Sequence, residues 1–141
     1  MDRKGFTLVE SILGLFLLGL IGVTTLPIIH SSLIIFKNHN IRLEMMYIGE
    51  MTIEKIKAYN IDSESDLYIY DVAVSELIEL FNRNNSIEID LPKKENNEKF
   101  SLKIIKDEKL DSLWMLSVYV YHNKEGSNIS NVEYLAYLRK K

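Results

Sequence analysis

The sequence predicts an α+β fold in which one long N-terminal helix packs on a small antiparallel sheet. Three patterns support this prediction: a charge-free apolar run, an amphipathic helical stretch after it, and alternating apolar residues in the last third. A chain of 141 residues suffices for one domain and an appendage. The chain has no cysteine, which excludes disulfides and cysteine-based metal sites.

The apolar run extends from Ser11 to Phe36 and contains no Asp, Glu, Lys or Arg. It is longer than the roughly 20 residues that a helix needs to cross a bilayer. Arg3 and Lys4 precede it and favour a cytoplasmic N-terminus with the remainder outside, although Lys37 and Arg42 follow it. A secretory signal would have a shorter apolar core and a small-residue cleavage site. We therefore expect a single-pass membrane helix, with a plain signal anchor as an alternative.

Glu10 lies at the start of this run, where a carboxylate in hydrocarbon is costly and calls for a functional role or a place at headgroup level. The segment Lys4-Gly5-Phe6-Thr7-Leu8-Val9-Glu10 resembles the cleavage site of the type IV prepilin and pseudopilin family. That family has a short charged leader ending in Gly, then Phe, then Thr-Leu-hydrophobic-Glu, then a long apolar stretch. The resemblance covers residues 1–36.

The resemblance implies that residues 1–5 are a leader and that a prepilin peptidase cuts between Gly5 and Phe6. It implies N-methylation of Phe6, and pairing of Glu10 with the amine of Phe6 on a neighbouring subunit. An ion pair of this kind helps to fix register. The implied partners are the peptidase, other pilins or pseudopilins, an assembly-platform membrane protein and the membrane itself. The implied location is the inner or cytoplasmic membrane, and after assembly a filament at the cell surface, in the periplasm or in the cell wall.

Residues 6–36 are expected to form a transmembrane and filament-core helix, and residues 37–60 its amphipathic continuation. Pro27 predicts a kink, because proline removes a backbone hydrogen bond. Gly49 is either a weak point or a site of close packing. The apolar face of the continuation is Ile41, Met45, Ile48, Ile56 and Tyr59, with Thr52 filling the gap. The helix would end near Tyr59, at a length of about 80 Å, as suits a pilin stalk.

Residues 61–141 are expected to form a pilin-like head. Ser75 to Arg83 predicts a short helix, and Asn60 to Asp71 an acidic linker, since a calcium loop would need a turn glycine. Loops are expected at Asp107–Ser112 and Asn123–Asn131. Four alternating runs predict strands; their apolar residues are Ile87, Ile89, Leu91; Phe100, Leu102, Ile104; Trp114, Leu116, Val118, Val120; and Val132, Tyr134, Ala136, Leu138.

The head shows no chemistry of its own in the sequence. His30, His39 and His122 lack zinc-ligand spacing, and no catalytic or phosphate-binding motif is present, so we expect no enzyme activity, metal or cofactor. The short basic end from Arg139 to Lys141 is too little to indicate nucleic-acid binding. The segment Met46 to Tyr59 loosely resembles PilV-type and I-class minor subunits.

We therefore expect a minor pilin or pseudopilin that joins or initiates a filament. The alternatives are a major pilin, a tip subunit that binds DNA or a surface ligand for competence or adhesion, and a signal-anchored protein with a chance motif. Pilus, secretion pseudopilus and competence filament all remain open.

Overall fold

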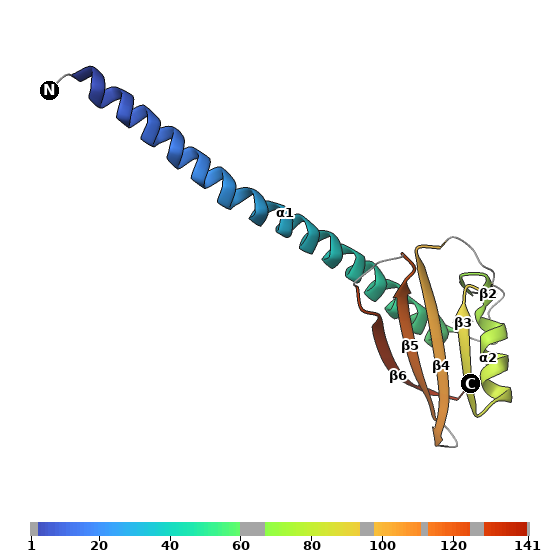
Figure 1. Cartoon of the computed structure of the whole chain (residues 1–141). Helices are drawn as coiled ribbons and strands as arrows, with labels where there is room; N and C mark the ends of the chain where they lie inside the picture. Colours follow the sequence, from blue (N-terminus) through green and yellow to red (C-terminus); the bar gives the residue numbers. More distant parts are fainter. Residues whose placement is uncertain (1–2, 60–66, 94–97, 111–112, 125–128, 141) are drawn as a thin grey trace. The chain divides into compact units, whose positions relative to one another are not determined.

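Figure 1 shows the computed structural model of the chain. It describes residues 3–59, 67–93, 98–110, 113–124 and 129–140, without the side chains at 3–6 and 109–110. The elements in chain order are α1 (Arg3–Ala58), β1 (Tyr68–Ile69), β2 (Val72–Ala73), α2 (Val74–Arg83), β3 (Ser86–Leu91), β4 (Phe100–Leu110), β5 (Leu113–His122) and β6 (Val132–Arg139). The predicted class, a long helix with a small antiparallel sheet, is confirmed.

Helix α1 runs without interruption from Arg3 to Ala58, which is about 80 Å at 1.5 Å per residue. Its predicted end near Tyr59 is confirmed. Pro27 lies inside α1 without ending it. Its nitrogen has no hydrogen to donate to the Val23 carbonyl, and the kink that we expect there stays a prediction.

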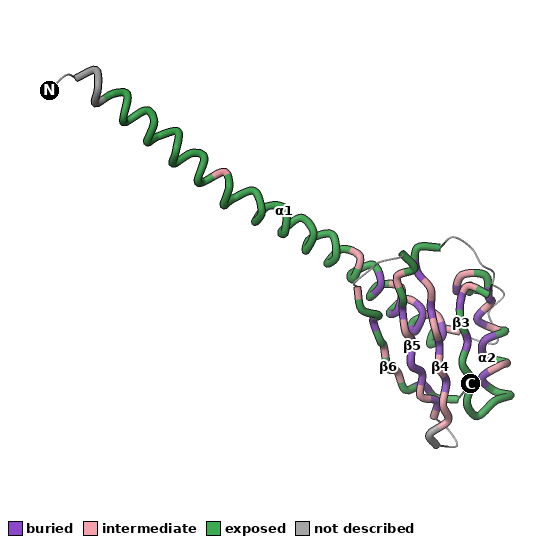
Figure 2. Tube along the Cα trace, viewed as in Figure 1, coloured by how far each residue is buried: buried purple, intermediate pink, exposed green. Residues whose placement is uncertain are grey.

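The chain divides into two compact units, Met1–Asn40 and Ile41–Lys141. In the first unit nearly every described side chain of α1 is exposed, as Figure 2 shows. In the second unit α1 has a buried face made of Met45, Gly49, Thr52, Ile53 and Ile56, flanked by the half-buried Ile41, Ile48 and Tyr59. The predicted apolar face is confirmed, with Ile53 added to it.

Strands β3 to β6 form one antiparallel sheet in sequential order. Ile89 lies opposite Ile104, and Val118 lies opposite both Ile104 and Tyr134. Alternation places the apolar residue of each such pair on one face, which we call the inner face. The second half of α1 and helix α2 both pack on this inner face, and the core lies between the two layers.

The expected loop at Asp107–Ser112 is wrong for the residues that the structure describes. Strand β4 continues to Leu110, with Asp107 opposite Met115 and Glu108 opposite Trp114. Polar residues stay in the strand here because they find partners across it, as described below. The second expected loop agrees with the described residues 123–124 and 129–131, which carry no strand.

The acidic linker expected at Asn60–Asp71 is also wrong at its C-terminal end. Residues 60–66 lie outside the described residues, but Ile69 and Val72 are buried in the hairpin of β1 and β2. Tyr70 turns that hairpin at φ 52°, an uncommon conformation for a residue with a side chain. Its hydroxyl donates to the Phe100 carbonyl at 3.1 Å, which holds the hairpin against β4.

Candidate functional site

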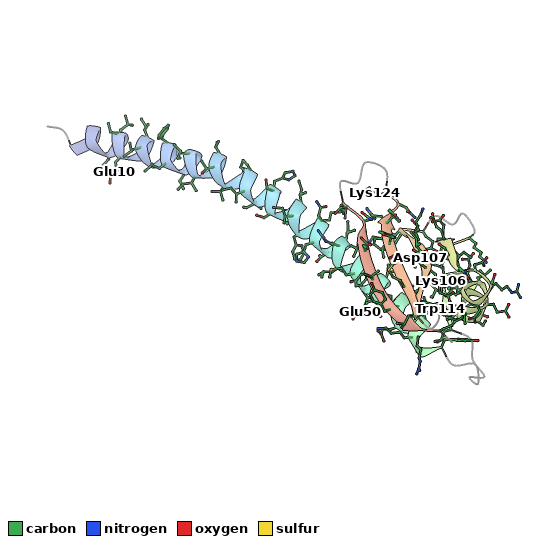
Figure 3. The ribbon with its side chains drawn as sticks, turned by 90° about the horizontal axis from the view of Figure 1, so that it is seen from below. Glu10, Glu50, Lys106, Asp107, Trp114 and Lys124 are labelled. Atoms are coloured by element: carbon green, nitrogen blue, oxygen red, sulfur yellow. The ribbon has the colours of Figure 1, made fainter. Side chains whose placement is uncertain are left out.

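The segment that resembles a processing site lies at the start of α1. The backbone of Gly5 and Phe6 is helical. Glu10 is exposed one turn further along and projects from the helix in Figure 3. Its described neighbours Val9, Ile12 and Leu13 are all exposed apolar residues. A single carboxylate therefore stands in an apolar surface, where it would need a cationic partner once water is excluded.

The apolar run is suited to an environment without water. Four hydroxyl groups within α1 donate to carbonyl oxygens one turn back, at 2.6 to 3.0 Å: Ser11 to Thr7, Thr24 to Leu20, Thr25 to Ile21, and Ser32 to Ile28. Because these donors are satisfied inside the helix, they cost little in hydrocarbon. Among the described residues, α1 is the one helix that is both long enough and apolar enough to cross a membrane.

A second cluster, which the sequence did not reveal, surrounds Lys106 on β4. Its side chain is 0% exposed. The ammonium group donates to the carbonyl oxygens of Asn84 at 2.6 Å and Asn85 at 3.2 Å, just after the C-terminus of α2. It also lies 5.5 Å from the centre of the Trp114 ring, and Figure 3 shows both residues in the head. A cation here complements the negative end of the α2 dipole.

Glu108 completes this cluster. One carboxylate oxygen accepts from Lys106 at 3.3 Å and the other from Lys140 at 3.2 Å. The hydrogen bond from Lys140, followed by that from Lys106, lowers the pKa of Glu108 below its ordinary value of 4.5. A signal for Lys106 was present in the sequence, since it continues the even-numbered positions of Phe100, Leu102 and Ile104 on the inner face.

The contacts around Lys106 indicate that this cluster stabilises the fold. Phe81 packs edge-on against Trp114 at 5.7 Å between ring centres, and closes the cluster from the α2 side. The Trp114 Nε1 is buried and has no hydrogen-bond partner among the described residues. The ammonium of Lys106 is already engaged by carbonyls and a carboxylate, so it is not a free nucleophile.

The head also carries a shallow apolar groove of about 420 Å³. It is lined by Leu43, Glu44, Tyr47, Ile48 and Phe100, and an ion pair between Glu44 and Lys99 lies beside it. The ammonium of Lys99 sits 4.9 Å from the centre of the Phe100 ring. The polar side-chain groups of this lining are the carboxylate of the paired Glu44 and the hydroxyl of Tyr47.

No group of three or more His, Asp or Glu among the described residues could hold a metal ion. Asp62, Glu64 and Asp66 lie outside the described residues. His30 and His39 lie on α1 and His122 at the end of β5, on elements that do not bring them into a cluster within the described chain. No protein-family model matches the chain, and no curated protein and no solved structure is similar to it.

Proposed function

We propose that this protein is a type IV pilin-like filament subunit, of the minor pilin or pseudopilin kind. A prepilin peptidase cuts the chain between Gly5 and Phe6, and Phe6 becomes the methylated first residue. Helix α1 holds the subunit in the membrane before assembly and enters the filament afterwards. The head contributes no catalysis.

One observation carries the proposal: the first half of α1 is apolar, exposed on every side and interrupted by a single carboxylate, at Glu10. A membrane anchor alone does not need that carboxylate, which is costly in hydrocarbon. A helix that packs among other copies of itself gives it a use, because the amine created by cleavage at Phe6 supplies the opposite charge. The motif around Gly5 supplies the means to create that amine.

The test is mass spectrometry of the N-terminus after production beside a prepilin peptidase. A mature chain that begins at methylated Phe6 is the expected result. The matched control is Gly5→Val, which fills the small site before the cut bond and is expected to leave Met1 in place. An uncut wild-type chain beside an active peptidase would remove the basis of the proposal. The abundance of the subunit in purified filaments then separates a minor from a major pilin.

A further inference from the structure

Strand β6 is an open edge of the sheet. The order β3-β4-β5-β6 leaves one side of β6 without a partner among the described strands, and Figure 1 shows it at the border of the sheet. Edges of this kind pair with other chains unless charge, proline or a bulge protects them. Strand β6 has eight residues, no proline and no glycine. Its outward side chains at Leu135 and Tyr137 are 55% and 61% exposed.

The charges on β6 select a specific partner. Glu133 and Arg139 lie near its two ends and point to the same outer face as Leu135 and Tyr137. If a second β6 lies antiparallel to the first with Ala136 opposite Ala136, Glu133 of each copy lies opposite Arg139 of the other copy. Leu135 of each copy then lies opposite Tyr137 of the other copy. Within the residues of β6, shifting the register by two residues in either direction breaks both charge pairs, so Val132–Arg139 is complementary to itself in one register.

We propose that β6 is a homotypic docking edge, which joins two copies of this chain by antiparallel pairing centred on Ala136. The side chain of Arg139 is exposed and forms no ion pair or hydrogen bond with a described residue, so it is available to the second copy. Glu133 accepts a hydrogen bond from Tyr119 at 2.8 Å through one oxygen, which leaves the other oxygen for Arg139 of the second copy. The new ladder satisfies backbone groups that water now satisfies.

The opposite edge does not have this property. Strand β3 carries Glu88 and Asp90 on its outer face, and antiparallel self-pairing would bring these acids together. Lys103 of β4 already pairs with both carboxylates. Pro92 follows directly after β3 and stops the edge. Homotypic pairing is therefore specific to β6.

The pairing has a defined direction. The two-fold axis that relates the two copies is perpendicular to the sheet. A helix that lies flat on the sheet therefore runs in the opposite direction in the second copy. The stretch Ile41–Ala58 of α1 therefore runs in opposite directions in the two copies. The inferred role is the pairing of two copies of the chain through their heads, and it does not depend on the proposed cleavage at Gly5.

The experiment measures the monomer–dimer equilibrium of the full chain in detergent micelles by sedimentation equilibrium. Wild-type chains should dimerise as the protein concentration rises. Glu133→Arg should raise the dimer dissociation constant about tenfold, because two attractive pairs become repulsive. Adding Arg139→Glu to the same chain should restore dimerisation. Chains of this double variant should not pair with wild-type chains, since mixed pairs again oppose like charges. Glu79→Arg on α2 is the matched control, because it makes the same change of charge at an exposed position away from both sheet edges, and it should behave as wild type.

Cysteine cross-linking reads the register directly, because the chain has no cysteine of its own. A mixture of Glu133→Cys and Arg139→Cys chains should form a disulfide, since opposed residues in antiparallel strands lie about 5 Å apart. Either variant alone should not, because like positions are about 20 Å apart in this register. Equal cross-linking by one variant alone, or unchanged dimerisation of folded Glu133→Arg, overturns the proposal.

Discussion

Gly49 of α1 lies directly against the ring of Tyr134 on β6. A Cβ atom added to Gly49 would stand 2.6 Å from Cδ2 and 2.7 Å from Cε2 of that ring, and 3.4 Å from Val120. Real carbon atoms do not approach so closely, so this glycine allows the helix to contact the sheet. Close packing is therefore the reason for a residue that otherwise weakens a helix.

Gly49→Ala should lower the free energy of unfolding by about 1 kcal/mol. Overpacking costs about 1–3 kcal/mol, and the better helix propensity of alanine returns about 1 kcal/mol of it. Urea unfolding followed by fluorescence measures the change, because Trp114 is the single tryptophan and is buried. In a Tyr134→Ala background the clash is gone, and Gly49→Ala should instead stabilise the chain by about 1 kcal/mol. The same sign in both backgrounds would refute the contact.

Lys106→Met should destabilise the head by about 2–4 kcal/mol. The methionine fills a similar volume but leaves the carbonyl oxygens of Asn84 and Asn85 without their cationic donor, and a hydrogen bond to a charged group contributes about 1.5–3 kcal/mol. The control is Lys93→Met, which removes a surface pair with Glu76 and should cost less than about 1 kcal/mol. Comparable losses in the two variants would show that burial of Lys106 contributes nothing.

Glu108 should make the free energy of unfolding of the head depend on pH in the acidic range. Hydrogen bonds from Lys140 and Lys106 hold its folded-state pKa below the ordinary 4.5. The unfolded chain therefore takes up the proton first, so the contribution is complete above about pH 4.5 and is lost as the pH falls through the lowered folded pKa. The measurement is the unfolding free energy of wild type minus that of Glu108→Gln between pH 7 and pH 3. We expect a constant difference that shrinks below pH 4.5; a difference independent of pH would contradict this.

Glu10→Ala should leave cleavage after Gly5 intact and impair incorporation into filaments. The cut bond is four residues away, whereas assembly under the proposed function needs a carboxylate to receive the amine of Phe6. An unpaired buried charge costs about 3–5 kcal/mol, which corresponds to a loss of at least a hundredfold in assembled subunit. Immunoblots of sheared filaments and of membranes give the ratio. Normal incorporation of the cleaved variant would remove the pairing role and leave cleavage untouched.

The sequence predicted the architecture well where one period dominates. The alternation from Trp114 to Val120 and the helical spacing from Ile41 to Tyr59 follow directly from what each surface contacts. Prediction failed at Asp107 to Leu110, where three charged residues interrupt the apolar pattern before the strand ends. The carbonyl oxygens that accept from Lys106 lie more than twenty positions earlier in the chain, and no local pattern reveals them.

The proposed roles of Gly5, Phe6 and Glu10 rest on a motif that is local in the sequence, and the structure does not enter that prediction. The Lys106 cluster and the contact of Gly49 with Tyr134 depend on tertiary packing. A lysine in a strand is usually exposed. Only the alternation of the strand, which places Lys106 on the same face as Ile104, indicated that this lysine is buried. Tyr70 gave no signal either, since positive φ values fall mostly on glycine and asparagine.

The attachment of α2 to β4 also determines how the head opens. A helix of ten residues is too short to persist in water by itself. Its C-terminal end is bound by the ammonium of Lys106 and, through Asn85, by the amide of Glu108 at 2.9 Å. Unwinding α2 alone would leave the ammonium of Lys106 buried beside Trp114 without its carbonyl partners. We therefore expect the helix and the strand to exchange their amide hydrogens as one cooperative unit, with the last turn of α2 as slow to open as the middle of the sheet.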